Sequence, residues 1–312
     1  MSGGPLRVAI VGYGKIAQDQ HVPAIRANPD LELVACVSRR DIAPEGMPSF
    51  GSIGELRAAG LAVDAAALCN TPGERLETAL ETIAAGWHTL LEKPAASTLG
   101  AAETITRVAA GRGISLFATW HSRFAPAVET ARRILAGRRI DRIDIRWREN
   151  VRKWHPNQAW IWQAGGFGVF DPGINALSIA TRILELDLDI ATAQLEIPAN
   201  RQMPIAAALQ FTGPCVPAAA SAAFDWRAEV GEEWTIAIDH DAGTLTLLDG
   251  GDRLLVDGQP ALLEPEAEYP ALYRRFVDLV RAKASDVDLS PLRLVADAFL
   301  VGTRRTTDAF ED

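Results

Sequence analysis

The sequence predicts an α/β protein, with a doubly wound parallel sheet in the first part of the chain and an α+β domain built on an antiparallel sheet in the second. Two observations predict this fold. Between residues 6 and 119, short apolar strands alternate with helical segments, which is the pattern of βαβ units with parallel pairing. After residue 121 the pattern changes to longer alternating strands, separated by turns such as 241–243 and 249–251 that contain Asp and Gly and are typical of hairpins.

The chain of 312 residues is longer than one hydrophobic core usually serves, so we expect two domains. We place them at residues 1–121 and 122–312, and a C-terminal helix of the second domain can pack back on the first. The first domain should contain strands at 6–11, 31–38, 63–69, 88–91 and 114–119, and helices at 15–27, 74–85 and 101–110. The second should contain helices at 124–135, 269–282 and 292–304, and strands at 140–151, 193–197, 205–211, 218–226 and 233–239.

Composition excludes several classes of function. The net charge of -9 argues against a nucleic-acid partner, because phosphates need a basic surface. The first residues lack a basic segment followed by an apolar run, and no stretch approaches the ~20 apolar residues of a membrane span. We therefore expect a cytoplasmic protein with no membrane partner. Three widely spaced cysteines and five histidines without an i, i+4 pair predict no metal site.

A glycine-rich turn joins the first expected strand to the first expected helix. In this turn, Gly12 allows a tight bend, Gly14 allows the backbone to approach a pyrophosphate, and Ala17 allows the helix to pack against the strand. The helix N-terminus then offers free amides to phosphates. We interpret the turn as a Rossmann dinucleotide site and assign Gly12, Gly14, Lys15 and Ile16 to it. The alternative is a glycine-rich turn that binds no ligand.

The end of the second expected strand indicates which dinucleotide is bound. A site selective for NAD usually carries an acidic residue there, which holds the ribose 2′-hydroxyl. This chain has Ser38, Arg39 and Arg40 instead, and a guanidinium can pair with a 2′-phosphate or stack on adenine. We therefore expect NADP as the preferred cofactor, with NAD also accepted, and assign Ser38 and Arg39 to the site. Alternatively, the two arginines are only solvated charges in a turn.

Two more segments follow later strands of the first domain, at the edge where doubly wound sheets bind ligands. Residues 70–72 come after the third expected strand and residues 92–94 after the fourth. From the second segment we assign Glu92 and Lys93 to the cofactor site. Lys93 should also reach the substrate, although a lysine before a proline is often an ordinary loop residue.

Together these features resemble the Gfo/Idh/MocA oxidoreductase family. The shared elements are residues 12–17, 71–72, 92–94 and 171–175, and the resemblance spans essentially the whole chain. Because their segment resembles this family, we also assign to the cofactor site Asn70, Thr71 and Pro72. Within the family, residues 118–123, 153–156, 168–179, 269–273 and 285–288 are similar to the bacterial L-arabinose/D-galactose 1-dehydrogenases. The resemblance implies a Rossmann domain and a domain with a large, open sheet, with a sugar between that sheet and the nicotinamide. It also implies a homodimer formed through the exposed face of the sheet.

The resemblance implies a reaction as well: oxidation of an L-arabinose-, D-galactose- or L-fucose-type aldose at its anomeric carbon to the lactone, with hydride transfer to NADP or NAD. Many family members carry a histidine base where this chain has Asn175, and an amide can only position the C1 oxygen. Our candidate base is therefore Asp171, with Lys93 and Asn175 stabilising the developing oxyanion. The alternative base is Lys93, deprotonated by burial. Asp171 could also simply cap the helix that begins near Pro172.

Sugar binding needs polar groups for hydroxyls and flat apolar faces for C–H surfaces. Residues 147–162 supply both, and we assign Glu149 to ring hydroxyls and Trp154 to stacking or to an indole hydrogen bond. We also place His121, together with Lys93, in the substrate site. Each tryptophan of the segment could equally belong to the core. The rival functions are an inositol or other sugar dehydrogenase acting at another carbon, and a non-catalytic sugar or dinucleotide sensor.

Overall fold

The computed structural model describes residues 4–40, 42–265 and 268–311, and the chain divides into two compact units. The first unit extends to His121, where we placed the domain boundary, and also includes helix α8 (Glu268–Ala282) and the residues that follow it to Leu289. The second unit begins at Ser122 and resumes at Ser290. The first three residues, which entered the prediction of a cytoplasmic protein, and the last residue lie outside the described residues.

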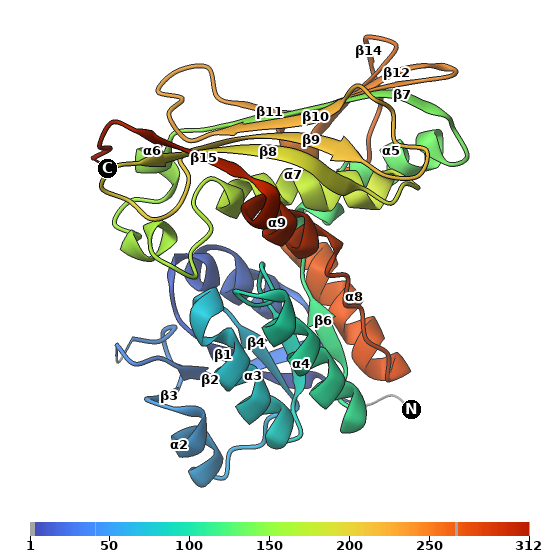
Figure 1. Cartoon of the computed structure of the whole chain (residues 1–312). Coiled ribbons are helices and arrows are strands. Elements are labelled where there is room, and N and C mark those ends of the chain that lie inside the picture. The colour runs from blue at the N-terminus through green and yellow to red at the C-terminus, as the bar shows by residue number, and fades with distance from the viewer. Residues whose placement is uncertain (1–3, 41, 266–267, 312) are drawn as a thin grey trace. The chain divides into compact units, whose positions relative to one another are not determined.

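The first unit is built on the predicted parallel sheet, whose order is β3-β2-β1-β4-β5-β6 (Figure 1). All of its strand pairs are parallel. The strands are β1 (Leu6–Val11), β2 (Leu31–Val37), β3 (Ser49–Phe50), β4 (Ala65–Leu68), β5 (His88–Leu91) and β6 (Leu116–Ala118). Besides α8, the helices are α1 (Val22–Ala27), preceded by a π-helical segment Ala17–His21, α2 (Ile53–Ala58), α3 (Arg75–Ala84) and α4 (Leu99–Gly111).

Local sequence explains where these helices begin. Ser52 accepts a hydrogen bond from the amide of Glu55 at 3.1 Å and so caps α2, and Thr98 does the same for α4 through Ala101 at 3.2 Å. These side-chain oxygens satisfy amides that the first helical turn leaves unpaired. Central strand β4 is fully buried and almost all alanine, so helices can pack closely on both of its faces.

The second unit contains the large, mostly antiparallel sheet, whose order is β14-β13-β12-β11-β7-β10-β9-β8-β15. Its parallel pairs are β7 with β10 and β8 with β15. The strands are β7 (Ile140–Arg148), β8 (Asp189–Pro198), β9 (Ala206–Thr212), β10 (Ala220–Asp225), β11 (Glu233–His240), β12 (Gly243–Leu248), β13 (Arg253–Val256), β14 (Gln259–Pro260) and β15 (Thr303–Thr307). The helices are α5 (Val128–Leu135), α6 (Val151–Trp154), α7 (Phe170–Ile183) and α9 (Ser290–Val301). Helices α7 and α9 cover one face of the sheet (Figure 1).

The structure corrects the prediction for the chain's last element. The expected helix over 292–304 ends at Val301, and Thr303–Thr307 form edge strand β15 beside β8. Gly302 makes this switch possible, because a Cβ there would lie 2.4 Å from the carbonyl oxygen of Ala298. Other boundaries also differ by a few residues; for example, α5 begins at Val128 rather than at 124, β7 ends at Arg148 rather than at 151, and β8 begins at Asp189 rather than at 193. In the described part of the chain, no helix is long and apolar enough to cross a membrane.

Candidate active site

The glycine-rich turn of the first unit has the geometry that dinucleotide binding requires. Gly12 has φ of +90°, and a Cβ on it would lie 2.6 Å from the amide nitrogen of Asn70, so no other residue fits there. A Cβ on Gly14 would meet nothing within 4 Å, which leaves room for a pyrophosphate beside the backbone. Lys15 is exposed and pairs with Asp19 one turn further on, and Ile16 directly precedes the π-helical segment. These residues fit a dinucleotide.

The residues predicted to choose between NADP and NAD lie at the end of β2. Ser38 is buried, and its hydroxyl accepts a hydrogen bond from the amide of Arg40 at 3.3 Å. The side chain of Arg39 is 79% exposed and pairs with Glu74, an acidic residue that our sequence analysis did not consider. An exposed guanidinium on this strand end can therefore meet a 2′-phosphate, with Glu74 as its competing partner.

The loop after β4 is held by its own polar side chains. Asn70 donates to the hydroxyl of Thr78 at 3.0 Å, and Thr71 donates to Glu74 at 3.2 Å. Pro72 begins a short 3-10 turn that leads into α3. Since Asn70 lies directly against Gly12, this loop and the glycine-rich turn form one continuous backbone surface at the carboxyl edge of the sheet.

Glu92, at the end of β5, is a buried carboxylate with several partners. Tyr269 donates to its Oε1 at 2.9 Å, Thr119 donates to its Oε2 at 3.0 Å, and Nε2 of His21 lies 3.7 Å from Oε2. Burial by itself would raise the pKa of Glu92, but the interaction with nearby His21, with smaller contributions from other cations, lowers it below its usual range. Glu92 is therefore an ionised anchor directly before Lys93.

His121 belongs to the same cluster in the first unit. Its Nδ1 lies 2.6 Å from Oε2 of Glu268, and its ring stacks on Tyr269 with a centroid distance of 5.4 Å. Burial acts to lower the pKa of His121, but Glu268 and Glu92 raise it above its ordinary value. We call this group of residues the Lys93 cluster; its members are Glu92, Lys93, His121, Glu268 and Tyr269.

In the second unit, Asp171 and Asn175 lie four residues apart in α7, on one face of the helix. Asp171 is buried in the first turn, where a carboxylate is stabilised by the helix dipole. It does not occupy the N-cap position, which is Val169. Helix α7 lies close to the sheet because residue 173 is glycine, whose Cβ position is 3.1 Å from the ring of Phe224.

Glu149, just after β7, is also buried, and both of its carboxylate oxygens accept indole hydrogen bonds. Trp226 donates to Oε1 at 3.2 Å and Trp234 to Oε2 at 3.0 Å. His155 lies between Glu149 and Asp171, with Nε2 3.6 Å from Glu149 Oε1 and Nδ1 3.8 Å from Asp171 Oδ2. We call this group of residues the Asp171 cluster; its members are Glu149, His155, Asp171, Asn175, Trp226 and Trp234.

Trp154 is 42% exposed and lies beside this cluster. Its indole nitrogen donates to Glu232 at 2.6 Å, and its ring packs edge-on against Trp234 with centroids 5.6 Å apart. The ammonium of Lys153 lies 4.5 Å from the centre of the Trp154 ring. Trp154 is therefore held in place at the surface and does not belong to the core.

Our sequence analysis missed several residues of the two clusters. Trp226, Trp234 and Glu268 were not singled out, and His155 was noted only as part of a polar and aromatic segment. One signal was available for Trp234. It pairs with Trp147 across strands β7 and β11, and Trp147 lies on the same face as Glu149 because the two residues are two positions apart. No local pattern could have paired Tyr269 with Glu92, since 177 positions separate them.

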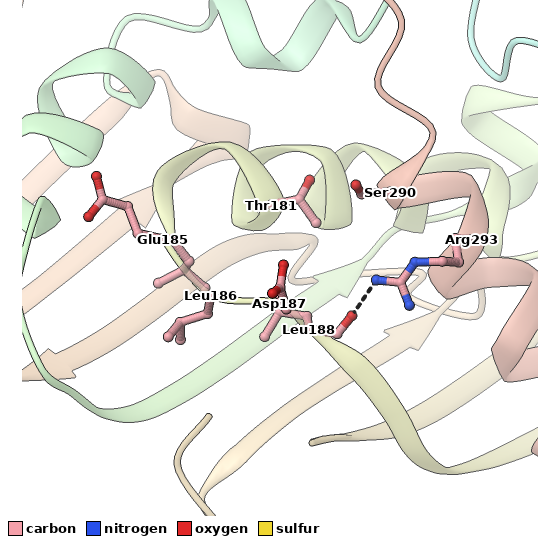
Figure 2. Close-up of a pocket in the computed structure, with 8 residues that line it drawn as sticks. Thr181, Glu185, Leu186, Asp187, Leu188, Ser290 and Arg293 are labelled. Carbon is pink, nitrogen blue, oxygen red and sulfur yellow. Dashed lines mark hydrogen bonds between the residues drawn. The ribbon is translucent and has the colours of Figure 1, made fainter. Parts of the chain in front are cut away.

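A cavity of about 270 Å³ lies elsewhere in the second unit, between the end of α7 and the start of α9. In Figure 2, Arg293 reaches from α9 toward the loop after α7 and donates to the carbonyl oxygen of Leu188 at 2.8 Å. None of the predicted site residues lines this cavity. Within the described ranges, no group of three or more His, Cys, Asp and Glu side chains is placed to hold a metal ion.

Comparisons with known proteins establish the class to which this chain belongs. Residues 6–119 match the oxidoreductase family with an NAD-binding Rossmann fold. A relative is 48% identical over 309 residues that cover 99% of both sequences. The chain therefore belongs to this oxidoreductase family.

That relative is the galactose 1-dehydrogenase of Pseudomonas fluorescens. The crystal structure of a D-galactose-1-dehydrogenase from Rhizobium etli superposes with a TM-score of 0.95 at 47% identity, covering 100% of this chain and 99% of that one. A 3-ketoreductase from Actinomadura kijaniata, solved with NADP, has a TM-score of 0.82 at 20% identity and covers 97% of this chain and 99% of its own. At that identity the likeness concerns the fold alone.

Proposed function

We propose that this chain is an aldose 1-dehydrogenase that oxidises the anomeric carbon of D-galactose-type pyranoses to the lactone, with NADP preferred and NAD accepted. The observation that carries the proposal is the end-to-end similarity to a galactose 1-dehydrogenase at 48% identity. L-Arabinose belongs to the proposed substrate class because its pyranose ring has the same configuration at C2, C3 and C4 as D-galactose. L-Fucose is 6-deoxy-L-galactose and has the mirror-image ring, so only the family resemblance places it in this class. We propose a cytoplasmic location as well.

The chemistry requires removal of a hydride from C1 and a proton from the C1 hydroxyl. When bound, the nicotinamide accepts the hydride. The protein must orient the sugar, exclude water and take the proton, and we propose that the carboxylate of Asp171 takes it. Asn175, one helical turn away, can donate its amide to the C1 oxygen as the carbonyl forms. In the alternative assignment, Lys93 is the base that takes the proton of the C1 hydroxyl.

Glu149 and Trp154 remain our proposed sugar contacts. A carboxylate offers about four lone-pair sites, so Glu149 can receive sugar hydroxyls in addition to its two indole donors. Those donors fix the carboxylate in one orientation, which favours discrimination between epimers. Trp154 is oriented by Glu232 and exposes part of its ring for a C–H surface.

The cofactor preference rests on the end of β2. Ser38 and Arg39 replace the usual acid, and the exposed guanidinium of Arg39 can exchange Glu74 for a 2′-phosphate. The phosphates themselves would be held by the turn at Gly12–Ile16, where Gly12 and Asn70 lie in contact.

A homodimer formed through the open face of the nine-stranded sheet is also part of the proposal. Helices α7 and α9 cover only one face (Figure 1). On the other, β9 and β10 expose small or polar side chains, namely Ala208, Gln210, Thr212 and Ala223, which suit flat packing against a second copy. Light scattering of the purified protein at several concentrations tests this part, and a monomer at all of them would contradict it.

Initial rates at 340 nm test the function. We expect turnover on D-galactose and L-arabinose that exceeds turnover on D-glucose and myo-inositol, and that is faster with NADP than with NAD at subsaturating cofactor. L-Fucose tests whether the mirror-image ring is also accepted. Activity on myo-inositol alone would favour a dehydrogenase for another carbon. Sugar binding in calorimetry without turnover on any sugar would favour a sensor.

A further inference from the structure

Arg75, the first residue of α3, is an arginine with a side chain only 1% exposed. Burial lowers its pKa to about 10, so the guanidinium stays charged at neutral pH. Burying a charge is unfavourable unless hydrogen bonds compensate. A single buried cation at the start of a helix, where the helix dipole also disfavours positive charge, therefore calls for a specific role.

The partners of Arg75 are oxygens of two separate loops. Its Nη1 donates to the carbonyl oxygens of Glu92 and Pro94, the second at 3.3 Å. Its Nη2 donates to the carbonyl oxygen of Asn70, and its Nε donates to the Asn70 side chain at 3.2 Å. One planar guanidinium thus joins the loop after β4 to the loop after β5.

The accepting carbonyls lie on both sides of Lys93. Residue 92 is fixed a second time through its carboxylate, which accepts hydrogen bonds from Tyr269 and Thr119. The backbone that carries Lys93 is therefore held at residue 92 by its carbonyl and side chain and at residue 94 by its carbonyl. The same guanidinium fixes Asn70, which contacts the glycine-rich turn at Gly12.

From this geometry we propose that Arg75 is a positioning residue: it sets the placement of the Lys93 ammonium relative to the backbone surface formed by Gly12 and Asn70. The inference rests on the role proposed above for Lys93. Only arginine can perform this task, because a planar fork of five donors reaches several carbonyls at once, whereas a lysine is a single point of charge. A displacement of about 1 Å in a reacting group can cost about 10²-fold in rate.

The test compares Arg75→Lys and Arg75→Gln with Arg107→Lys, a control at an exposed position of α4. Three quantities are measured: kcat with D-galactose and saturating NADP, the Kd for NADPH by fluorescence, and amide hydrogen exchange over residues 68–72 and 91–96. For both Arg75 variants we expect kcat to fall about 30- to 100-fold and exchange to accelerate in these two segments. The Kd for NADPH should rise by a clearly smaller factor than kcat falls, and the pH profile of kcat should shift.

Several results would overturn the proposal. The first is a kcat of the Arg75 variants within twofold of the parent, and the second is a loss of NADPH affinity as large as the loss of kcat. The third is failure of both Arg75 variants to fold. Each of these results would assign Arg75 a purely structural role. Lys93→Met separates this inference from the proposed function. If Lys93→Met keeps full activity, the proposed role of Lys93 fails; if it is inactive while Arg75→Lys is fully active, only the positioning role fails.

Discussion

Each unit contains a buried glutamate with two neutral donors and a nearby histidine, yet the two arrangements differ in what surrounds them. Glu92 accepts hydrogen bonds from the hydroxyl groups of Tyr269 and Thr119, and the histidine beside it, His21, is completely buried. Glu149 accepts hydrogen bonds from two indole N–H groups. The neighbouring histidine, His155, is 15% exposed, and its Nδ1 lies 3.8 Å from Oδ2 of Asp171. The enclosed network around Glu92 anchors a loop. The partly exposed chain from Glu149 through His155 to the carboxylate of Asp171 can instead respond to a ligand.

The physical reason for the contrast lies in how each carboxylate is balanced. Around Glu92, Nδ1 of His21 lies 2.7 Å from the hydroxyl of Tyr273, and His21 and Glu92 are both buried. Around Glu149, the two indole donors are neutral, and His155 lies between the carboxylates of Glu149 and Asp171. His155 is therefore close to both carboxylates of the second unit, whereas Glu92 is surrounded by buried partners.

The largest expected effect comes from Asp171→Asn. An asparagine keeps the size of the side chain but cannot accept the C1 proton, so kcat should fall about 10²- to 10⁴-fold, the usual contribution of a positioned base. Rates with D-galactose at saturating NADP measure this. Asp187→Asn, in the loop after α7, is the matched control. A kcat within fivefold of the parent would assign the base to Lys93.

A smaller effect is expected for Glu149→Gln. Loss of a hydrogen bond to a charged group costs about 1.5–3 kcal/mol, which corresponds to roughly a 10- to 150-fold fall in kcat/KM. The fall should be greater for D-galactose than for an epimer that lacks the bound hydroxyl arrangement. Glu229→Gln, an exposed position in the same unit, should leave kcat/KM unchanged. Equal losses for all sugars would remove Glu149 from substrate recognition.

For Glu92→Gln, the expected effect is on stability and depends on pH. The folded-state pKa of Glu92 lies below its unfolded value, so the carboxylate contributes stability above about pH 4.3, and this contribution disappears as the pH falls through the folded pKa. Urea unfolding at pH 7 should show a loss of about 1–3 kcal/mol for the variant, and the difference from the parent should shrink below pH 4. A difference that is constant with pH would contradict an ionised anchor.

The smallest effect is expected at the cofactor's 2′ position. Because Arg39 is 79% exposed, solvent weakens its interaction, and Arg39→Ala should raise the KM for NADP by up to about fivefold while the KM for NAD changes little. Glu74→Gln removes the competing carboxylate and should lower the KM for NADP. Equal changes for both cofactors in Arg39→Ala would exclude recognition of the 2′-phosphate by this residue.

The sequence was most informative where structure is local. The glycine-rich turn and the strand that ends before Glu92 both follow from short patterns, and the parallel sheet predicted from the alternation of strands and helices is confirmed. Local patterns failed where partners are distant. Strand β15 forms only because β8 offers it an edge, and the indole donors of Glu149 come from residues 77 and 85 positions away.

The central claim is that oxidation occurs at the anomeric carbon, and D-galactose deuterated at C1 tests it most directly. The account predicts that the deuterium moves to the reduced nicotinamide, with a primary isotope effect on kcat/KM when hydride transfer limits the rate, and that the first product detected by NMR is the lactone. Turnover that leaves the deuterium in the sugar would mean that another carbon is oxidised and would contradict the account.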